Sequence, residues 1–379
     1  MNPILRGALE AKVIENALVL SCREGLSPTP LALKIELLPL LQLFDGRTSE
    51  EQLRSKSVEL YGTDEVYKRI YQILDDNLFL ENPRANDERV KKRSEYLNGT
   101  TRAAQFSGSI SPDGLEARRE YVASLTDREK KFNKAKFIIA PHIDYRRGSE
   151  TYGATFGSVA PQAWKSCILI GTGHQYSQEL YTVSTKNFTL PGHTFYSDTS
   201  KIESLKNGND TRIFQDEFLH SREHSLELSL PFLELIAPDC KIVPILVGSF
   251  YEYLEDGVRP DKTFINSLAT IIDDETGIIA GVDMAHLGQD FGDAKAVDDL
   301  WLREIEVRDR EYLNCFPDPD KLWDHVAEDM DARRMCGFPT LYTLFELFKL
   351  TGKSPALELV EYRQAATENC CVTFAGLVG

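Results

Sequence analysis

Two patterns of apolar residues alternate along the chain from Lys136 onward. Short runs that are apolar throughout are separated by longer stretches with apolar residues at helical spacing. The apolar runs are FIIA (137–140), CILIGT (167–172), KIVPILVG (241–248) and GIIAGVD (277–283). Strands of this kind are typical of a parallel sheet whose two faces are both covered. We therefore predict an α/β fold, a mainly parallel sheet with helices on both faces, for residues 101–379.

The same pattern gives approximate positions for the other elements of this domain. Amphipathic stretches predict helices near 151–164, 224–236 and 261–272, and further helices up to residue 350. Two β-like runs, ALELVEY from Ala356 and CCVTFAGLVG from Cys370, are expected to add strands to the sheet or its edge.

Residues 1–84 show a different pattern and are predicted to form a small domain. A leucine-rich stretch over 31–44 predicts a helix, and Thr48-Ser49-Glu50-Glu51 predicts a capped helix start. Apolar residues at helical spacing predict another helix over 64–80, which ends in a short strand at Phe79-Leu80. This order is similar to a winged helix. It also resembles the PqqD type of domain, in which a winged helix holds a leader peptide for a modifying enzyme.

The segment over 85–100 is polar and charged, and we interpret it as a linker between the two domains. The small domain carries 10 basic and 13 acidic residues over 1–84, which argues against DNA as its ligand. Docking of a protein or peptide, or a purely structural role, is favoured instead.

Composition narrows the classes of function. The 379 residues are 42% apolar, enough for a folded globular protein, and 43 basic against 59 acidic residues give a net charge of −16. This charge disfavours binding to nucleic acid or to an anionic membrane. No stretch approaches the ~18 apolar residues of a membrane span, so we expect a cytoplasmic protein. The seven cysteines form no CxxC pair, and most are expected to be small buried hydrophobic residues.

Candidate chemistry lies where the apolar runs end. His142 follows the first run, His174 follows the second, and Asp283 and His286 follow the fourth. Ligands of open α/β sheets bind beyond the carboxyl ends of the strands, so these side chains are expected at one rim. Imidazoles with a carboxylate suit Fe(II) or Zn(II). His142, His174 and Asp283 could supply such a set, with His286 as a competing ligand.

A fourth histidine, His224, is expected in the first turn of the helix predicted over 224–236. A helix N-terminus favours a neutral imidazole, which can act as a general base. We count Glu223, beside it in sequence, and Tyr145, in the segment after FIIA, with His224 as candidate catalytic residues.

Several separate blocks, in this order, resemble the Memo family over roughly residues 100–379. The blocks are RAAQFSGSISPDGLEARR (102–119), APHIDY (140–145), GTGHQYS (171–177), LPGHTFYSD (190–198), EHSLELSLPFLELI (223–236), KIVPILVG (241–248), GVDMAHLGQDFGD (281–293) and CGFPTLYTLFEL (336–347). The resemblance implies a fold similar to class III non-haem iron-dependent extradiol dioxygenases. The added N-terminal segment suggests the longer prokaryotic form, which occurs in systems with a radical-SAM protein and a small companion protein.

The resemblance also implies roles for residues. His142 and His174 match two metal-site histidines, and His224 matches the acid/base histidine of the dioxygenases. A third metal-site position, a cysteine two residues after the aspartate in some Memo proteins, is Ala285 here. Because alanine has no ligating atom, Asp283 or His286 would have to complete a site for Fe(II), Zn(II) or Cu. The alternative is a remnant site that holds no metal.

Two functions therefore stay open. One is a metal-dependent redox or hydrolytic enzyme that acts on a small substrate at the histidine-lined rim. The other is a non-catalytic component that binds a peptide or protein in a radical-SAM-associated system, with the N-terminal domain as a second contact.

Overall fold

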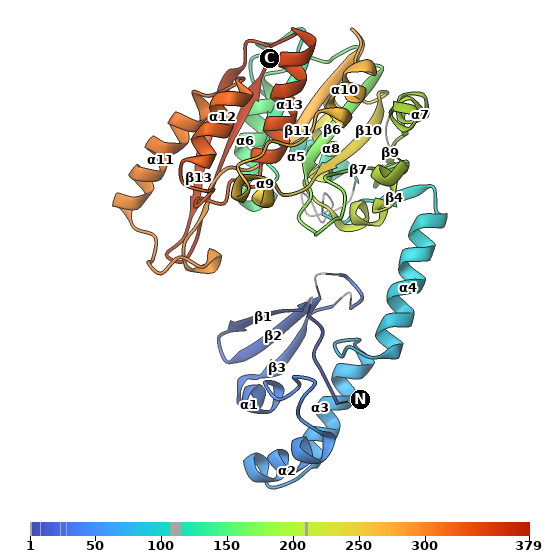
Figure 1. Cartoon of the computed structure of the whole chain (residues 1–379), viewed down its shortest axis with the longest axis vertical. Coiled ribbons are helices and arrows are strands. Elements are labelled where there is room, and N and C mark those ends of the chain that lie inside the picture. Colours follow the sequence, from blue (N-terminus) through green and yellow to red (C-terminus); the bar gives the residue numbers. More distant parts are fainter. Residues whose placement is uncertain (1, 8, 23, 28, 107–114, 209–210) are drawn as a thin grey trace. The chain divides into compact units, whose positions relative to one another are not determined.

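The computed structural model describes all residues except 1, 8, 23, 28, 107–114 and 209–210 (Figure 1). The chain divides into two compact units, Met1–Asn98 and Gly99–Gly379. Each unit has a core of its own. Among the described residues, no helix has both the length and the apolar character needed to cross a membrane.

Unit 1 is a three-stranded antiparallel sheet in the order β1-β2-β3, followed by helices. Its elements are β1 (Leu9–Ile14), β2 (Ala17–Cys22), β3 (Leu31–Lys34), α1 (Leu38–Leu41), α2 (Glu50–Tyr61), α3 (Glu65–Asp76) and α4 (Pro83–Asn98). The predicted start of α2 is confirmed, because the Ser49 side chain accepts from the Gln52 N–H while the Gln52 side chain accepts from the Ser49 N–H. The winged-helix likeness of this unit stays a prediction.

Two segments of unit 1 differ from the sequence-based expectation. The leucine-rich stretch 31–44 is not one helix, because its first four residues pair with β2 and only Leu38–Leu41 are α-helical. The segment read as a linker over 85–100 lies mostly in α4, a helix that packs on unit 1. There Arg89 donates to both carboxylate oxygens of Glu81 at 3.2 and 3.1 Å. Polar composition alone does not distinguish a linker from an exposed helix.

Unit 2 contains an eight-stranded sheet with the order β12-β14-β5-β11-β6-β10-β7 and with β13 paired to β14. The strands are β5 (Phe137–Ala140), β6 (Ser166–Thr172), β7 (Tyr181–Val183), β10 (Lys241–Val247), β11 (Thr276–Gly281), β12 (His286–Leu287), β13 (Glu358–Ala366) and β14 (Cys371–Val378). The four predicted apolar runs form β5, β11, β6 and β10, which are mutually parallel, whereas the strands at both flanks are antiparallel. The predicted α/β fold is confirmed as a mixed sheet with a parallel centre.

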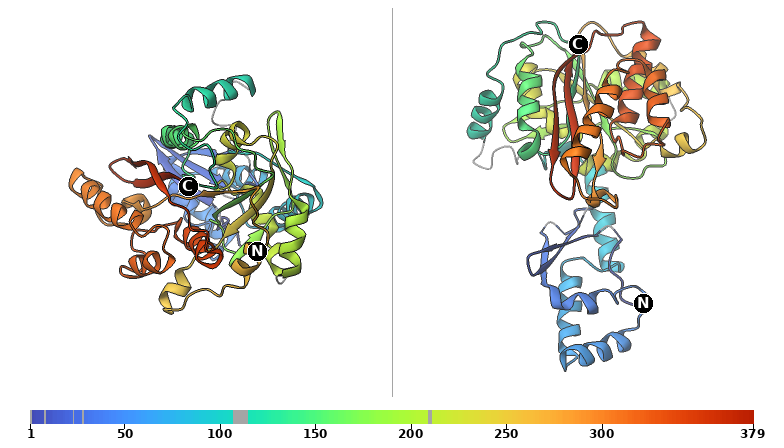
Figure 2. Two further views of the ribbon diagram at one scale, coloured as in Figure 1. Left: turned by 90° about the horizontal axis from the view of Figure 1, so that it is seen from above. Right: turned by 90° about the vertical axis from the view of Figure 1, so that its left-hand side faces the viewer.

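Helices cover both faces of this sheet (Figures 1 and 2). Successive residues of β6 enter different cores: Ile168 packs with one and Leu169 with the other. The first core includes residues of α7 (Thr199–Gly208), α10 (Thr263–Thr270), α11 (Asp299–Leu313), α12 (Pro319–Ala327) and α13 (Phe338–Thr351). The second includes residues of α5 (Leu115–Leu125), α6 (Tyr145–Gly157) and α8 (Leu230–Ile236). The remaining elements are α9 (Tyr251–Glu255) and a small sheet of β4 (Thr101–Ala103), β8 (Asn187–Leu190) and β9 (His193–Phe195).

Two helices of unit 2 are displaced from their predicted positions. The helix expected over 151–164 begins earlier, because the Asp144 side chain caps α6 by accepting from the Arg147 N–H. The helix expected over 224–236 begins later, at Leu230, after the 3₁₀ turn η5 (Glu227–Ser229). His224 therefore lies in the connection before η5, not in the first turn of a helix.

Candidate metal centre

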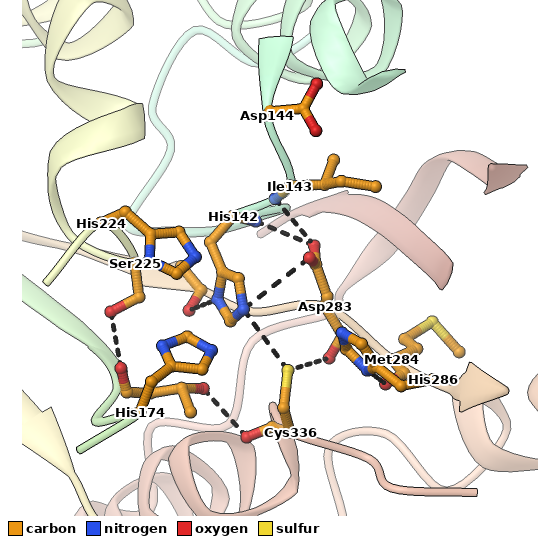
Figure 3. Close-up of polar contacts among 12 residues, drawn as sticks. His142, Ile143, Asp144, His174, His224, Ser225, Asp283, Met284, His286 and Cys336 are labelled. Carbon is orange, nitrogen blue, oxygen red and sulfur yellow. Dashed lines mark hydrogen bonds and ion pairs between the residues drawn. The ribbon is translucent and has the colours of Figure 1, made fainter. Parts of the chain in front are cut away.

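Neighbouring strands bring the predicted residues together. β11 pairs with β5 on one side and with β6 on the other, and Gly281 is in register with both Ala140 and Gly171. Three strands therefore end at the same level, and His142, Asp283 and His174 each follow a strand end by two residues. The connection before η5 adds His224 to this rim (Figure 3).

The three histidine rings form one cluster. Ring centroids lie 4.9 Å apart for His142 and His174, 5.3 Å for His142 and His224, and 4.6 Å for the stacked His174 and His224. His142 is only 2% exposed. The side chains of His174 and His224 are 36% and 34% exposed, so solvent reaches the cluster from their side.

Glycine is required where the His224 connection crosses the sheet. A Cβ added at Gly281 would lie 1.9 Å from the carbonyl oxygen of Ser225, a distance that no side chain can adopt. The Ser225 hydroxyl donates to the Thr172 carbonyl at 2.8 Å and so fixes the connection over β6. The bare backbone at the end of β11 thus allows His224 to approach His142.

A buried ion pair holds the other end of this connection. Arg102 of β4 pairs with Glu227 of η5, and its guanidinium also donates to the carbonyl oxygens of His220 and Glu223, both at 2.8 Å. Both side chains of the pair are buried. Because a buried pair with its hydrogen bonds satisfied resists local movement, it fixes the backbone that carries Glu223 and His224.

His142 is held in one tautomer. Its Nδ1–H donates to the Gly281 carbonyl at 2.9 Å, so Nε2 carries the lone pair. Burial, followed by the neighbouring imidazole of His174, lowers the pKa of His142 to about 3. The ring is therefore neutral at pH 7 and able to ligate a metal through Nε2.

Glu223 holds His174 in the same way. His174 Nδ1 lies 2.9 Å from Glu223 Oε1, and the His174 backbone N–H donates to Oε2 at 3.0 Å. Burial opposes the charge of Glu223, but its hydrogen bonds and the nearby imidazoles of His174 and His224 outweigh it and hold the pKa of the carboxyl well below its usual range. Burial likewise lowers the pKa of His174, but the hydrogen bond and charge of Glu223 outweigh it and the pKa is raised. His174 Nε2 is left for a ligand.

His224 is neutral for a different reason from the one predicted. Burial, followed by the imidazoles of His142 and His174, lowers its pKa to about 4, and no helix N-terminus is involved. Its Nδ1 lies 3.3 Å from Glu223 Oε1, which leaves Nε2 as the basic atom.

Cys336 is the residue that the sequence analysis missed. It lies just before α13, and its Sγ is 3.4 Å from His142 Nε2. The Thr172 hydroxyl donates to the Cys336 carbonyl at 2.9 Å. Burial raises the pKa of the thiol well above its usual value. The signals in the sequence were the place of Cys336 at the start of the CGFPTLYTLFEL block and directly before Gly337 and a helix with proline in its first turn.

Among the described residues, two groups have ligand-type atoms that all lie within 4.8 Å of one another: His142, His174 and Cys336, and His174, Glu223 and His224. In the second group, Glu223 is already an acceptor for His174. In the first group no carboxylate takes part, and Cys336 Sγ contacts His142 Nε2 at 3.4 Å. The rim therefore has a sulfur donor although residue 285 is an alanine, because Cys336 supplies one from another loop.

Asp283 and His286, the alternatives for a third ligand, belong to neither group. Asp283 Oδ1 accepts the backbone N–H groups of His142 and Ile143 at 2.9 and 3.2 Å, which orders the loop that carries His142. Its Oδ2 lies 3.7 Å from His142 Nε2. His286 Nδ1 contacts the carbonyl oxygens of Met284 and Arg334 at 3.1 and 3.2 Å, so it ties β12 to the loop before Cys336.

Tyr145, the remaining candidate, packs in the core. Its hydroxyl donates to the Leu228 carbonyl at 2.8 Å, and its ring contacts Tyr152 and Phe232. Burial raises the pKa of the phenol well above its usual value, so it stays protonated at pH 7. The hydrogen bond of Tyr145 thus holds the backbone of η5 in place.

Comparisons with known proteins show the family of the chain. The family model described as "Memo-like protein" matches residues 102–378. A MEMO1 family protein of Aquifex aeolicus is 24% identical over 352 residues, which cover 90% of this chain and 91% of that protein. A MEMO1 family protein of Thermus thermophilus is 26% identical over 60% of this chain and 67% of its own length. Protein MEMO1 of Xenopus laevis is 27% identical over 50% of this chain and 64% of its own length. The chain belongs to the Memo-like protein family.

Proposed function

We propose that this protein binds one transition-metal ion through His142, His174 and Cys336 and uses it for redox or hydrolytic chemistry on a small substrate. The observation that carries the proposal is the orientation of the two imidazoles. Each has its Nδ1 held by a fixed acceptor, so that Nε2 is left for a ligand, and the thiol of Cys336 lies 3.4 Å from Nε2 of His142. Metal-ligating histidines are commonly oriented by such partners.

The three residues fit a metal in spacing and in chemistry. Ligand atoms about 2.0–2.3 Å from one ion lie about 3–4 Å from one another, which agrees with the 3.4 Å between Cys336 Sγ and His142 Nε2. One thiolate and two imidazoles suit Zn(II) or Cu(I), and imidazoles also suit Fe(II). A cation at this position would offset the burial that keeps the thiol protonated.

A bound metal ion would supply Lewis acidity or a redox couple beside the substrate. The chain itself supplies a base. His224 is neutral at pH 7, it is partly exposed, and its Nε2 can accept a proton from a substrate held at the rim. Glu223, 3.3 Å from His224 Nδ1, would stabilise the imidazolium that forms.

The test is metal content by elemental analysis of anaerobically purified full-length protein, before and after separate addition of Fe(II), Zn(II) and Cu. We expect close to one metal ion per chain in the wild type and its loss in His142→Ala/His174→Ala and in Cys336→Ser. Cys315→Ser, which removes a partly exposed thiol elsewhere, is the matched control and should keep its metal. Absence of uptake in the wild type, or full retention in Cys336→Ser, would contradict the proposal.

A second function, recognition of a partner by unit 1, is favoured by one feature. Among the described residues, β1 pairs with β2 alone and is therefore an edge strand, and it exposes Val13 and Ile14. An exposed apolar edge strand is suited to pairing with another chain. The proposed partner is a radical-SAM protein or its small companion. Val13→Lys/Ile14→Lys in the full chain should weaken co-purification with that partner, and Lys12→Glu on the same strand is the control.

A further inference from the structure

Two adjoining pockets lie beside the candidate metal ligands. The inner pocket, of about 160 Å³, is lined by both His174 and Cys336. The outer pocket, of about 410 Å³, is lined by His174 but not by Cys336. They share Gly173, His174, Gly248, Ser249 and Tyr251, so they form one cleft that extends to Cys336. Its size suits a small molecule.

The charged groups of this cleft are acidic. Asp331 lines the inner pocket, and Glu179 and Glu252 line the outer one. Among the residues that the structure describes, none that lines either pocket is a lysine or an arginine. Arg212 pairs with Glu179 at 3.3 Å, but its side chain is largely exposed, so this pair stands at the outer rim. Glu252 and Asp331 leave the cleft with net negative charge, which repels anions and attracts cations.

Aromatic side chains make up much of the apolar lining of the cleft. Tyr176 and Tyr251 line the outer pocket and are 85% and 56% exposed, Tyr253 lines it as well, and Phe250 lines the inner pocket. Exposed aromatic rings offer flat surfaces to another ring and attract an ammonium group through their π-faces. Acidic and aromatic side chains therefore favour the same class of ligand.

We propose that this cleft binds small aromatic amines in their protonated form and rejects the corresponding carboxylates and phosphates. The inference deepens the proposed function, since it names the substrate class of the same rim. The ammonium group lies toward Glu252 or Asp331, and the aromatic body lies along the tyrosines toward His174.

The experiment uses two probes with the same phenol ring and opposite charge, tyramine and 4-hydroxyphenylacetate. Their dissociation constants are measured by calorimetry on the full-length protein, first metal-free and then metal-loaded. We expect tyramine to bind at least about tenfold more tightly than the acid in the metal-free form, because a unit charge several ångströms from a carboxylate in a partly wet cleft changes affinity by about five- to tenfold. In the metal-loaded form the preference should be smaller, since a cation at His174 and Cys336 attracts the acid. Raised salt should reduce the difference.

Variants test which side chains cause the preference for tyramine. Glu252→Gln should weaken tyramine binding about five- to tenfold and leave the weak binding of the acid equal or improved, whereas Glu120→Gln, an exposed glutamate on α5, should change neither. Tyr251→Leu should weaken tyramine in both protein forms. Equal binding of the two probes to the metal-free protein, tighter binding of the acid to it, or no detectable binding of either probe overturns the proposal. The metal-free arm separates it from the metal proposal, since failure of metal uptake would leave the selectivity of the cleft measurable.

Discussion

At the scale of single residues, the partner of Nδ1 in each site histidine determines that Nε2 is left to bind a metal or to accept a proton. Glu223 accepts hydrogen bonds from His174 Nδ1 and from the backbone N–H groups of His174 and Ser225. Its charge makes His174 a better donor toward a metal. The same carboxylate lies beside His224, so one residue supports both the proposed ligand and the proposed base.

Glu223→Gln should therefore lower metal affinity by about ten- to hundredfold, the usual effect of losing such a partner. The amide can still accept the His174 Nδ1–H, so the fold should persist and the loss should appear in the affinity, measured by competition with a chelator of known strength. Glu120→Gln is the control. An unchanged metal affinity in Glu223→Gln would show that the imidazole of His174, which Glu223 holds, is not a metal ligand.

The lowered pKa of His142 predicts how the stability of the protein changes with pH. His142 has a pKa of about 3 in the folded protein against 6.5 when unfolded, so below pH 6.5 the unfolded state binds a proton that the folded state refuses. The stability that depends on His142 is thus present above pH 6.5 and falls as the pH is lowered toward 3.

In metal-free protein, the difference in free energy of unfolding between the wild type and His142→Gln should shrink by about 1.4 kcal/mol per pH unit between pH 6 and pH 4. Urea unfolding at several pH values with a chelator present measures it. Comparison with the variant removes the contributions of His220, which has a lowered pKa, and of Asp331, which has a raised pKa. A constant difference across this range would contradict a buried neutral His142.

Sequence reasoning identified the parts of the site that follow from strand ends. His142, His174 and Asp283 could be placed together because parallel strands of a buried sheet end at one rim. Cys336 could not, since it is 53 residues from Asp283, its nearest neighbour in sequence among these site residues. Its position depends on a loop in which Met330, Asp331 and Arg334 adopt left-handed backbone angles, and no periodic pattern encodes such a loop.

At the scale of elements, the buried central strands of unit 2 were predicted well, whereas the strands of unit 1 and the helix boundaries were not. A buried strand is recognised from its composition alone, whereas a helix start depends on local caps such as Asp144 and on the tertiary pairing that turned Leu31–Lys34 into a strand. The 3₁₀ turn before α8 is such a local feature. Because α8 begins only after this turn, His224 lies in a connection over the sheet and not in the predicted helix.

Because the connection that carries His224 passes so close to Gly281, a substitution of this glycine tests how the connection lies over β11. Gly281→Ala places a Cβ against the Ser225 carbonyl, so the connection that carries His224 must move or the protein must lose stability, by about 2–4 kcal/mol for a steric conflict in a core. Gly248→Ala, directly after β10 of the same sheet, is the matched control because its Cβ would meet the Leu180 carbonyl at an ordinary 3.4 Å. Urea unfolding compares the two variants. Equal stabilities would contradict the close approach at Gly281.

At the scale of the whole molecule, the two units are predicted to be separable in folding and in metal binding. The core of unit 1 is built from residues of 1–98, and every proposed metal ligand and its hydrogen-bond partners come from unit 2. The alignment with the Aquifex aeolicus protein is longer than the whole of unit 2, so that relative shares part of unit 1 as well.

A protein that comprises residues 99–379 should therefore take up metal with the stoichiometry of the full chain, measured by elemental analysis, and it should keep the tyramine preference of the cleft. Any effect of unit 1 should appear only in the capture of a protein partner, because the described residues of this unit contribute no donor atom to the proposed centre. The matched comparison is the same truncated protein with Cys336→Ser, which should lose its metal as the full-length variant does. Loss of metal uptake on truncation, in a protein whose circular dichroism shows an intact fold, would mean that unit 1 completes the site, and the proposed division of roles between the two units would be wrong.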